Sequence, residues 1–315
     1  MARLLERLRP HAPEPIDSGV VAGQSNRCSG VITLFTDYGL NGPYVGQLKS
    51  RLIQTSALLA SPSPTIVDLM HDAPQFDPQR SAYLLAPCLP YLPSRSVLLA
   101  VVDPGVGSER AGLAIKLADS WLVGPDNGLM AVAAKRFGAK ETYRLAHPQT
   151  GVSPTFHGRD VFADVAVELA QDIAQGDPRE SSAHQPTRAI DSKSSPADFG
   201  QPHMDRAFLV SDMDTSSTGA IVGRDWPEDI DEIIYRDGYG NLHTGRRAAT
   251  VNDAARLVIS ESEIRRAEKF ADVAPGELFW YENSMGMVEV AANCESASHL
   301  LGEGGKIGTR FGWIN

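Results

Sequence analysis

Residues 96–107, Ser-Val-Leu-Leu-Ala-Val-Val-Asp-Pro-Gly-Val-Gly, form an apolar run that ends at a carboxylate and a glycine-rich turn. The run predicts a β-strand over Ser96–Asp103 that is buried on both faces, which is typical of parallel sheets covered by helices. Ligands of such sheets gather beyond the carboxyl ends of the strands. Asp103 is therefore a candidate functional residue, although a turn or a helix cap would explain an aspartate there equally well.

Strand-like and helix-like stretches alternate around this run, which favours a layered α/β domain over residues 30–176 with a largely parallel sheet. Glycine and proline residues mark most of the expected boundaries. We expect strands at Val31–Phe35 and Thr65–Leu69, helices at Pro43–Leu59, Asp77–Leu85 and Leu129–Phe137, a hairpin of Gly112–Ala118 with Trp121–Gly124, and a helix with Val161, Val165, Leu169 and Ile173 on one face.

The composition changes after residue 176. Residues 177–206 are rich in serine, proline and glycine and predict a polar linker or insertion. Residues 207–315 predict a smaller, mostly β, barrel-like domain, and residues 1–29 a poorly ordered extension. The expected short strands of this second domain are Ala207–Val210, Ala220–Val222, Glu232–Tyr235, Arg256–Ile259, Glu277–Tyr281 and Met287–Ala292, followed by a helix at Glu295–Leu301.

The overall composition limits the class of protein. The chain has 315 residues and a net charge of −10, whereas a protein that tracks nucleic-acid phosphates is usually basic. No apolar run reaches the length of a membrane span, and no secretory signal is evident. The three cysteines, Cys28, Cys88 and Cys294, are too few and too far apart for a disulfide framework. We therefore expect a cytoplasmic protein without a nucleic-acid or membrane partner.

Further candidate residues accompany Asp103. Asp37 follows the first expected strand as Asp103 follows the third. His157 precedes a helix, where it could act as a base or simply begin the helix. Arg110 could be catalytic or an ordinary surface charge. The common nucleotide, hydrolase and zinc-protease motifs (GxGxxG, GxxxxGK[ST], GxSxG and HExxH) are missing, and we expect no bound metal.

Six motifs, taken together and in order, make the chain resemble the SAM hydroxide adenosyltransferases, hydrolytic relatives of the chlorinases and fluorinases that use S-adenosylmethionine (SAM). The resemblance covers about residues 31–176 and 207–302. The motifs are Leu34–Gly39 with Pro43–Gly46, Val67-Asp68 through Phe76-Asp77, Val101–Arg110, Val123–Gly128, Thr155–Asp160, and the pair Asp237–Asn241 with Asn283–Gly286.

The resemblance implies that SAM is hydrolysed to adenosine and L-methionine by attack of water or hydroxide on the 5′ carbon of the ribose. It implies an N-terminal α/β domain, a C-terminal β domain, and a homotrimer whose sites lie between neighbouring subunits. No cofactor is implied beyond the substrate. The substrate contacts that it implies are Asp37 to the ribose hydroxyls, Phe76 against the sugar, Asp237, Asn241 and Ser284 to the methionine end, the backbone at Ala292 and Cys294 to the adenine, and pocket residues Tyr44, Phe156 and Met285.

Asp103, Arg110 and His157 match the catalytic triad of the hydrolytic subgroup. A carboxylate and an imidazole can orient a water molecule and accept its proton, and an arginine stabilises the hydroxide that develops. The halogenating relatives lack this carboxylate, which would repel a halide nucleophile. The fluorinating relatives also carry an arginine where this chain has Met285.

The chain departs from the family pattern at residues 240–245, where His243 and Gly245 are expected to alter the floor of the methionine pocket. Three alternatives to a hydrolase stay open at this stage. They are a SAM-dependent halogenase, a non-catalytic protein that binds SAM or adenosine, and a purely structural trimer.

Overall fold

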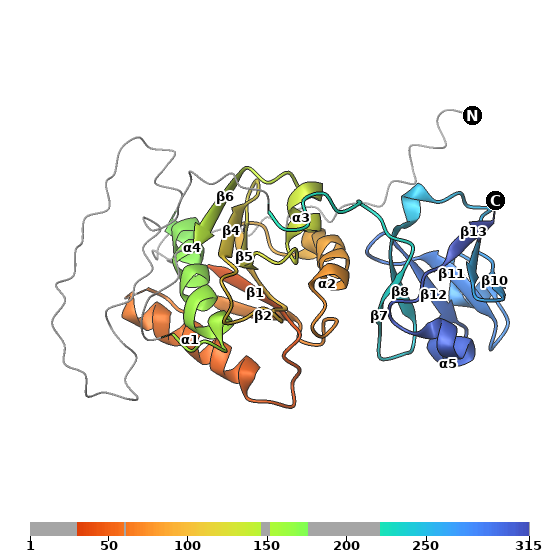
Figure 1. Cartoon of the computed structure of the whole chain (residues 1–315), viewed down its shortest axis with the longest axis horizontal. Helices are drawn as coiled ribbons and strands as arrows, with labels where there is room; N and C mark the ends of the chain where they lie inside the picture. The colour runs from red at the N-terminus through yellow and green to blue at the C-terminus, as the bar shows by residue number, and fades with distance from the viewer. Residues whose placement is uncertain (1–29, 60, 146–151, 176–220, 315) are drawn as a thin grey trace, which may run out of the picture.

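The structure is a computed structural model that describes residues 30–59, 61–145, 152–175 and 221–314 (Figure 1). The predicted extension 1–29, linker 177–206 and strand Ala207–Val210 lie outside these residues. The predicted α/β class is confirmed, with a mostly parallel sheet in the N-terminal lobe (residues 30–175) and antiparallel sheets in the C-terminal lobe (residues 221–314). The exact domain boundaries stay a prediction.

The N-terminal sheet has six strands in the order β2-β1-β3-β5-β4-β6. Neighbouring strands from β2 to β5 are parallel, whereas β4 is antiparallel to both β5 and β6. The strands are β1 (Val31–Thr36), β2 (Thr65–Met70), β3 (Ser96–Val101), β4 (Gly112–Lys116), β5 (Trp121–Pro125) and β6 (Glu141–Leu145). The chain leaves β1 toward one edge and returns to β3 on the other side, so the order reverses between these two strands.

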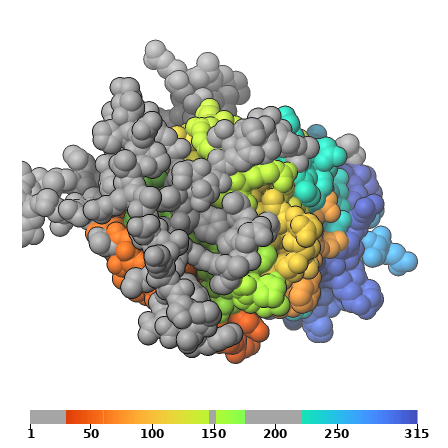
Figure 2. All heavy atoms as spheres, turned by 60° about the vertical axis from the view of Figure 1, so that its left-hand side comes forward, coloured from red at the N-terminus to blue at the C-terminus, as the bar shows by residue number. Residues whose placement is uncertain are grey.

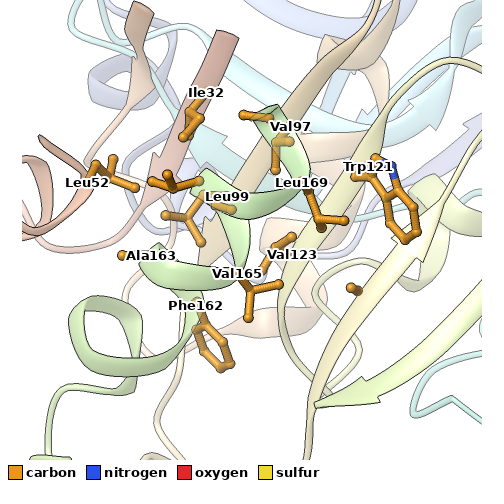
Figure 3. Packing of buried hydrophobic residues seen from close by; sticks show 14 of the residues in the cluster. Ile32, Leu52, Val97, Leu99, Trp121, Val123, Phe162, Ala163, Val165 and Leu169 are labelled. Atoms are coloured by element: carbon orange, nitrogen blue, oxygen red, sulfur yellow. The ribbon is translucent and has the colours of Figure 1, made fainter. Parts of the chain in front are cut away.

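Helices cover both faces of this sheet (Figure 1). The helices are α1 (Tyr44–Leu58), α2 (Pro78–Leu85), α3 (Ala131–Arg136) and α4 (Ala163–Gln175), and a π-helical turn, η3 (Gly158–Phe162), leads into α4. Figure 3 shows Val165 and Leu169 of α4 packed over Val97 and Leu99 of β3. Helices α2 and α3 contribute Leu85 and Ala133 to the core on the opposite face. The central strand β3 is buried along its whole length, as the sequence predicts.

Helices α1 and α4 are joined by a buried ion pair. Arg51 donates from Nε and Nη2 to the two carboxylate oxygens of Asp164, at 2.7 and 2.5 Å. The Thr55 hydroxyl adds a third hydrogen bond, of 2.6 Å. Asp164 is only 1% exposed, so its charge depends on these donors.

The C-terminal lobe consists of two antiparallel sheets that enclose one core. One has the order β11-β12-β8-β7 and the other β10-β9-β13. The elements are β7 (Ile233–Arg236), β8 (Leu242–Arg247), β9 (Arg256–Ile259), β10 (Ser262–Ile264), β11 (Leu278–Glu282), β12 (Met287–Ala292), α5 (Ala297–Leu301) and β13 (Gly312–Ile314). Within residues 221–314 the strands form two separate sheets rather than a closed barrel, which corrects the barrel-like part of the prediction.

Short 3₁₀ turns connect elements in both lobes. One lies in the N-terminal lobe at Ala86–Tyr91 (η2), and three lie in the C-terminal lobe at Ala248–Thr250 (η5), Phe270–Asp272 (η6) and Gly302–Gly305 (η7). The predicted strand Ala220–Val222 is wrong for its two described residues, because Ile221 and Val222 lie at the start of a turn. No helix in the described ranges is long and apolar enough to cross a bilayer.

The two lobes are in direct contact. In Figure 2 the blue C-terminal lobe lies against orange and yellow atoms of the N-terminal lobe. Arg80 of α2 donates from Nε to Glu232 at 2.6 Å, and the Tyr83 hydroxyl donates to the Pro227 carbonyl at 2.6 Å. These bonds fix the second lobe against α2.

Candidate active site

Asp37 and Asp103 lie just after the carboxyl ends of β1 and β3, the neighbouring strands at which the strand order reverses. Both line a pocket of about 520 Å³, together with Tyr44, Phe76, Phe156 and His157. The sequence-predicted residues of the N-terminal half therefore come together, as expected for the switch point of an open α/β sheet.

Asp103, Arg110 and His157 form one connected group. Arg110 pairs with Asp103 through both ends of its guanidinium, with 2.8 Å from Nε to Oδ1 and a second bond from Nη2 to Oδ2. Its Nη2 also lies 3.0 Å from Nδ1 of His157. Because arginine only donates, Nδ1 must accept, and a neutral His157 carries its proton on Nε2. The group is buried, with side-chain exposures of 9% for Arg110 and 5% for Asp103.

The loop after β3 shapes this group. The backbone turns at Asp103–Val106 and Gly105–Ser108 through hydrogen bonds of 3.3 and 3.1 Å. Gly107 has a φ of +83°, and a Cβ there would lie 2.6 Å from the Pro154 carbonyl oxygen. Only glycine allows this close approach. The loop thereby brings Arg110 back beneath Asp103 and holds the segment that carries His157 beside both.

Asp37 is held by the segment after β2. The Phe76 backbone N–H donates to its Oδ2 at 3.2 Å. Burial raises the pKa of Asp37, the hydrogen bonds from the backbone N–H groups of Phe76 and Asp37 partly lower it, and the nearby charge of Asp103 raises it further. The Asp37 side chain thus lines the pocket while one of its oxygens accepts a backbone hydrogen bond.

Aromatic residues form one wall of the pocket. Tyr44 and Phe156 meet edge to face with ring centroids 5.7 Å apart. Phe76 has a φ of +59° and is 75% exposed, which is unusual for a large apolar side chain. A strained, exposed aromatic side chain at the pocket rim is suited to contact a ligand or another subunit.

A second pocket, of about 860 Å³, lies in the C-terminal lobe. All six residues predicted for this half line it, namely Asp237, Asn241, Ser284, Met285, Ala292 and Cys294. Asp237 accepts from Asn241 Nδ2 at 3.1 Å and from the backbone N–H groups of Tyr239 and Asn241 at 2.9 Å each. The sequence motif Asp237–Asn241 is therefore a tight turn that points one carboxylate into the pocket.

Sequence reasoning missed several residues of the second pocket, among them Glu289, Tyr281 and Tyr239. Glu289 is buried, and it accepts from the Tyr281 hydroxyl at 2.6 Å and from Asn283 Nδ2 at 2.9 Å. Its signal was present in the sequence, because it is the one acid in the apolar strand Met287–Ala292. A buried acid in such a run points to a polar site.

The two departures from the family pattern have different consequences. His243 lines the second pocket, with Nε2 3.4 Å from Glu289 and 4.0 Å from Asp237. Gly245 does not line it, and a Cβ there would overlap Ile230. Ligand atoms of Asp237, His243 and Glu289 lie within 4.8 Å of one another, so these three could hold a cation. The same carboxylates suit an ammonium group equally well.

The two pockets share no lining residue in the part of the chain that the structure describes. The loop at Ser284 and Met285 instead packs against its own N-terminal lobe at η2. There the Tyr91 hydroxyl donates to the Ser284 carbonyl, and Cys88 Sγ lies 3.7 Å from Met285 Sδ. Each pocket thus presents only part of the predicted set of substrate contacts.

Comparison with known proteins agrees with this geometry. The N-terminal domain of the SAM hydroxide adenosyltransferases matches residues 32–177, and their C-terminal domain matches residues 231–306. The (R)-S-adenosyl-L-methionine hydrolase of Salinispora tropica is 34% identical over 276 residues, which cover 86% of this chain and 93% of that protein. The enzyme of the same name from Thermus thermophilus is 32% identical, with coverages of 86% and 95%.

More distant relatives agree as well. A fluorinase of Nocardia brasiliensis is 22% identical over 166 residues, which cover 44% of this chain and 54% of that protein. The crystal structure of an uncharacterized conserved protein from Thermotoga maritima superposes with a TM-score of 0.64 at 26% identity and covers 90% of this chain and 100% of that one. Both family domains match in order and together span most of the described residues, so this chain belongs to the SAM hydroxide adenosyltransferase family.

Proposed function

We propose that this protein hydrolyses SAM to adenosine and L-methionine. The observation that carries the proposal is the buried group of Asp103, Arg110 and His157 at the wall of the N-terminal pocket. The names of the relatives from Salinispora tropica and Thermus thermophilus support the same substrate and reaction.

The reaction asks little of a general acid, because the leaving group departs from a sulfonium as a neutral thioether. The protein must instead place a water molecule in line with the carbon–sulfur bond and exclude bulk solvent. As the water oxygen bonds to the 5′ carbon, the carbon–sulfur electron pair passes to sulfur. The water proton passes to the Asp103 carboxylate. His157 can donate a hydrogen bond from Nε2 to the oxygen of the attacking water. Arg110 holds both groups and stabilises the developing negative charge.

Asp103 also selects against halide nucleophiles. Two negative charges 4 Å apart repel by about 4 kcal/mol at an effective dielectric constant near 20. Arg110 offsets part of this repulsion, but its donors are already directed at Asp103 and His157. Water, which donates to a carboxylate, is the better partner for this site.

The remaining contacts follow the two pockets. We propose that Asp37 binds the ribose hydroxyls, with Phe76, Tyr44 and Phe156 around the sugar. In the second pocket, Asp237, Asn241 and Ser284 would hold the methionine end. Ala292, Cys294 and Met285 complete that pocket, the first two beside the adenine. Carboxylates in the second pocket suit the ammonium group of the substrate.

We further propose a homotrimer in which the N-terminal pocket of one subunit faces the C-terminal pocket of its neighbour. Two observations support this. The pockets share no lining residue, and large aromatic side chains at both rims are exposed, with 75% for Phe76 and 84% for Tyr239. A neighbouring subunit would cover them.

A cytoplasmic location belongs to the same proposal. Cys88 and Cys294 are both free thiols, which suits a reducing compartment. SAM is the only small molecule that the proposed reaction requires besides water.

The test of the proposed function is the variant Asp103→Asn, which keeps the shape of the side chain and one of its two hydrogen bonds from Arg110, to the amide oxygen. We expect the rate of adenosine formation from SAM to fall by about 10²–10⁴, because the water loses its proton acceptor. Adenosine binding, measured by calorimetry, should stay within about threefold of wild type because the sugar contacts are untouched. Turnover unchanged by this substitution would contradict the role of Asp103. Asp103→Ala is a poorer test, since it would leave Arg110 without either of its hydrogen bonds to residue 103.

A further inference from the structure

Tyr38 lines the N-terminal pocket with Asp103 and His157, yet the proposed mechanism gives it no task. It follows Asp37 directly, two residues beyond the end of β1. Its side chain therefore enters the pocket from the same strand end that presents the ribose-binding carboxylate.

The ring of Tyr38 is fixed from several sides. It meets Phe156 edge to face with centroids 5.5 Å apart, and it lies 6.2 Å from the ring of Tyr44. Its backbone N–H donates to the Thr36 hydroxyl at 3.3 Å. A ring held in this way carries its hydroxyl at a defined point, which is what an orienting group requires.

Gly158 shows where that point is. A Cβ at Gly158 would overlap the Tyr38 hydroxyl oxygen and would lie 3.4 Å from Cζ and 3.5 Å from Val101 Cγ1. The hydroxyl thus lies against the backbone of the residue after His157, at the end of β3 where Asp103 follows. Glycine at position 158 leaves the space that the hydroxyl occupies.

The hydroxyl keeps its proton. Burial raises the pKa of Tyr38 well above its usual value, the charges of Asp37 and Asp103 raise it further, and Arg110 lowers it in part. The phenol is a neutral group that can donate and accept hydrogen bonds without taking the proton of a water molecule.

None of the residues that the structure describes makes a hydrogen bond with this hydroxyl. A largely enclosed polar group of this kind normally bonds to water or to a ligand. The space in front of it is the pocket that Asp103 and His157 also line, which is where the proposed reaction needs its nucleophile.

We propose that Tyr38 is a further catalytic residue, whose hydroxyl hydrogen-bonds to the attacking water and aims it at the substrate carbon. This inference rests on the proposed SAM hydrolysis. Asp103 takes the water proton, Tyr38 holds the oxygen without exchanging charge, and the carbon–sulfur electron pair leaves with the thioether of methionine. Three groups then fix the water, so that one lone pair points at the 5′ carbon.

The test is steady-state hydrolysis of SAM by Tyr38→Phe, which removes one oxygen atom and keeps the ring. We expect kcat to fall at least about tenfold while KM changes less than about threefold, because the lost bond acts on water and not on SAM. A kcat within about twofold of wild type would overturn the inference. Wild-type protein that binds SAM without turnover would instead contradict the proposed function, and this role with it.

Two further variants control for a merely structural effect. Tyr143→Phe removes a hydroxyl that bonds to Glu141 on β6, and it should leave kcat unchanged. Gly158→Ala should lower kcat by displacing the Tyr38 hydroxyl, and adding it to Tyr38→Phe should cause no further loss. Losses that multiply in the double variant would show that Gly158 acts through His157 and would contradict the placement of the hydroxyl.

Discussion

Arg110 is the residue on which the proposed chemistry depends most. One guanidinium holds Asp103 at two atoms and reaches Nδ1 of His157 with a shared nitrogen. It also lies over the Phe162 ring, 5.2 Å from its centroid. This arrangement sets the tautomer of His157 and the orientation of Asp103 at once, so the three side chains act as one unit rather than as independent groups.

The pKa of Asp37 is raised, first by burial of its carboxyl group. The folded state therefore binds a proton more readily than the unfolded chain, and stability falls as the pH rises through the raised pKa. Asp37→Asn removes that loss. We expect its Tm to exceed that of wild type at pH 7, and the difference to vanish below the usual aspartate pKa of 3.8, where both states are protonated.

The same substitution should weaken the substrate contact. We expect KM for SAM to rise about tenfold, because a charge-assisted hydrogen bond to the ribose is replaced by a neutral one. Thermal melting across pH and steady-state kinetics measure the two effects separately. A Tm lower than wild type at pH 7 would show that the charge of Asp37 stabilises the fold instead.

Among the elements, helices α1 and α4 depend on the buried pair of Arg51 and Asp164. Arg51→Met should lower the free energy of unfolding by about 3 kcal/mol, because Asp164 is left charged, 1% exposed and bonded to Thr55 alone. Urea unfolding measures this loss. The matched control is Arg256→Met, whose partner Glu263 and own side chain are 51% and 60% exposed, so the loss there should be under about 1 kcal/mol.

Elements with a clear apolar pattern were predictable. Strands β1, β2 and β3 lie within one or two residues of the predicted bounds, and the hairpin of β4 and β5 forms as expected. The ends of β1 and β3 were also the right places to look for functional carboxylates, because strand polarity in a parallel sheet fixes where ligands gather.

Other elements carry no such pattern. Strand β8, Leu242–Arg247, is polar in sequence, and its Thr244 is buried because the hydroxyl donates to the Val288 carbonyl at 2.7 Å. Strand β6 is short and takes its register from β4. The left-handed backbone of Phe76 and the site of the Tyr38 hydroxyl depend on tertiary contacts that no local pattern records. Periodicity finds elements that bury one face, but it does not find those held by side-chain bonds.

For the whole molecule, the separation of the two pockets in one chain predicts complementation between subunits. We combine Asp103→Asn, which disables the N-terminal pocket, with Asp237→Asn, which disables the C-terminal one. If each site uses pockets from two subunits, about one third of the sites recover in trimers that contain both variants, because one intact N-terminal pocket then faces one intact C-terminal pocket.

The experiment is co-expression of the two variants with different affinity tags, followed by tandem purification and an assay of adenosine formation. Each variant expressed alone is the control and should be inactive or nearly so. Mixed assemblies that stay as inactive as the single variants would show that each chain supplies its own complete site, and the proposed subunit arrangement would be wrong.

The central claim is that water displaces methionine from the 5′ carbon of SAM, and one measurement addresses it directly. Wild-type protein is incubated with SAM in oxygen-18 water, with and without excess chloride and fluoride, and the products are identified by liquid chromatography and mass spectrometry. We predict adenosine with the heavy oxygen at its 5′ position, together with unlabelled methionine, whatever halide is present. Halogenated deoxyadenosine, or bound SAM without any product, would contradict the proposed function.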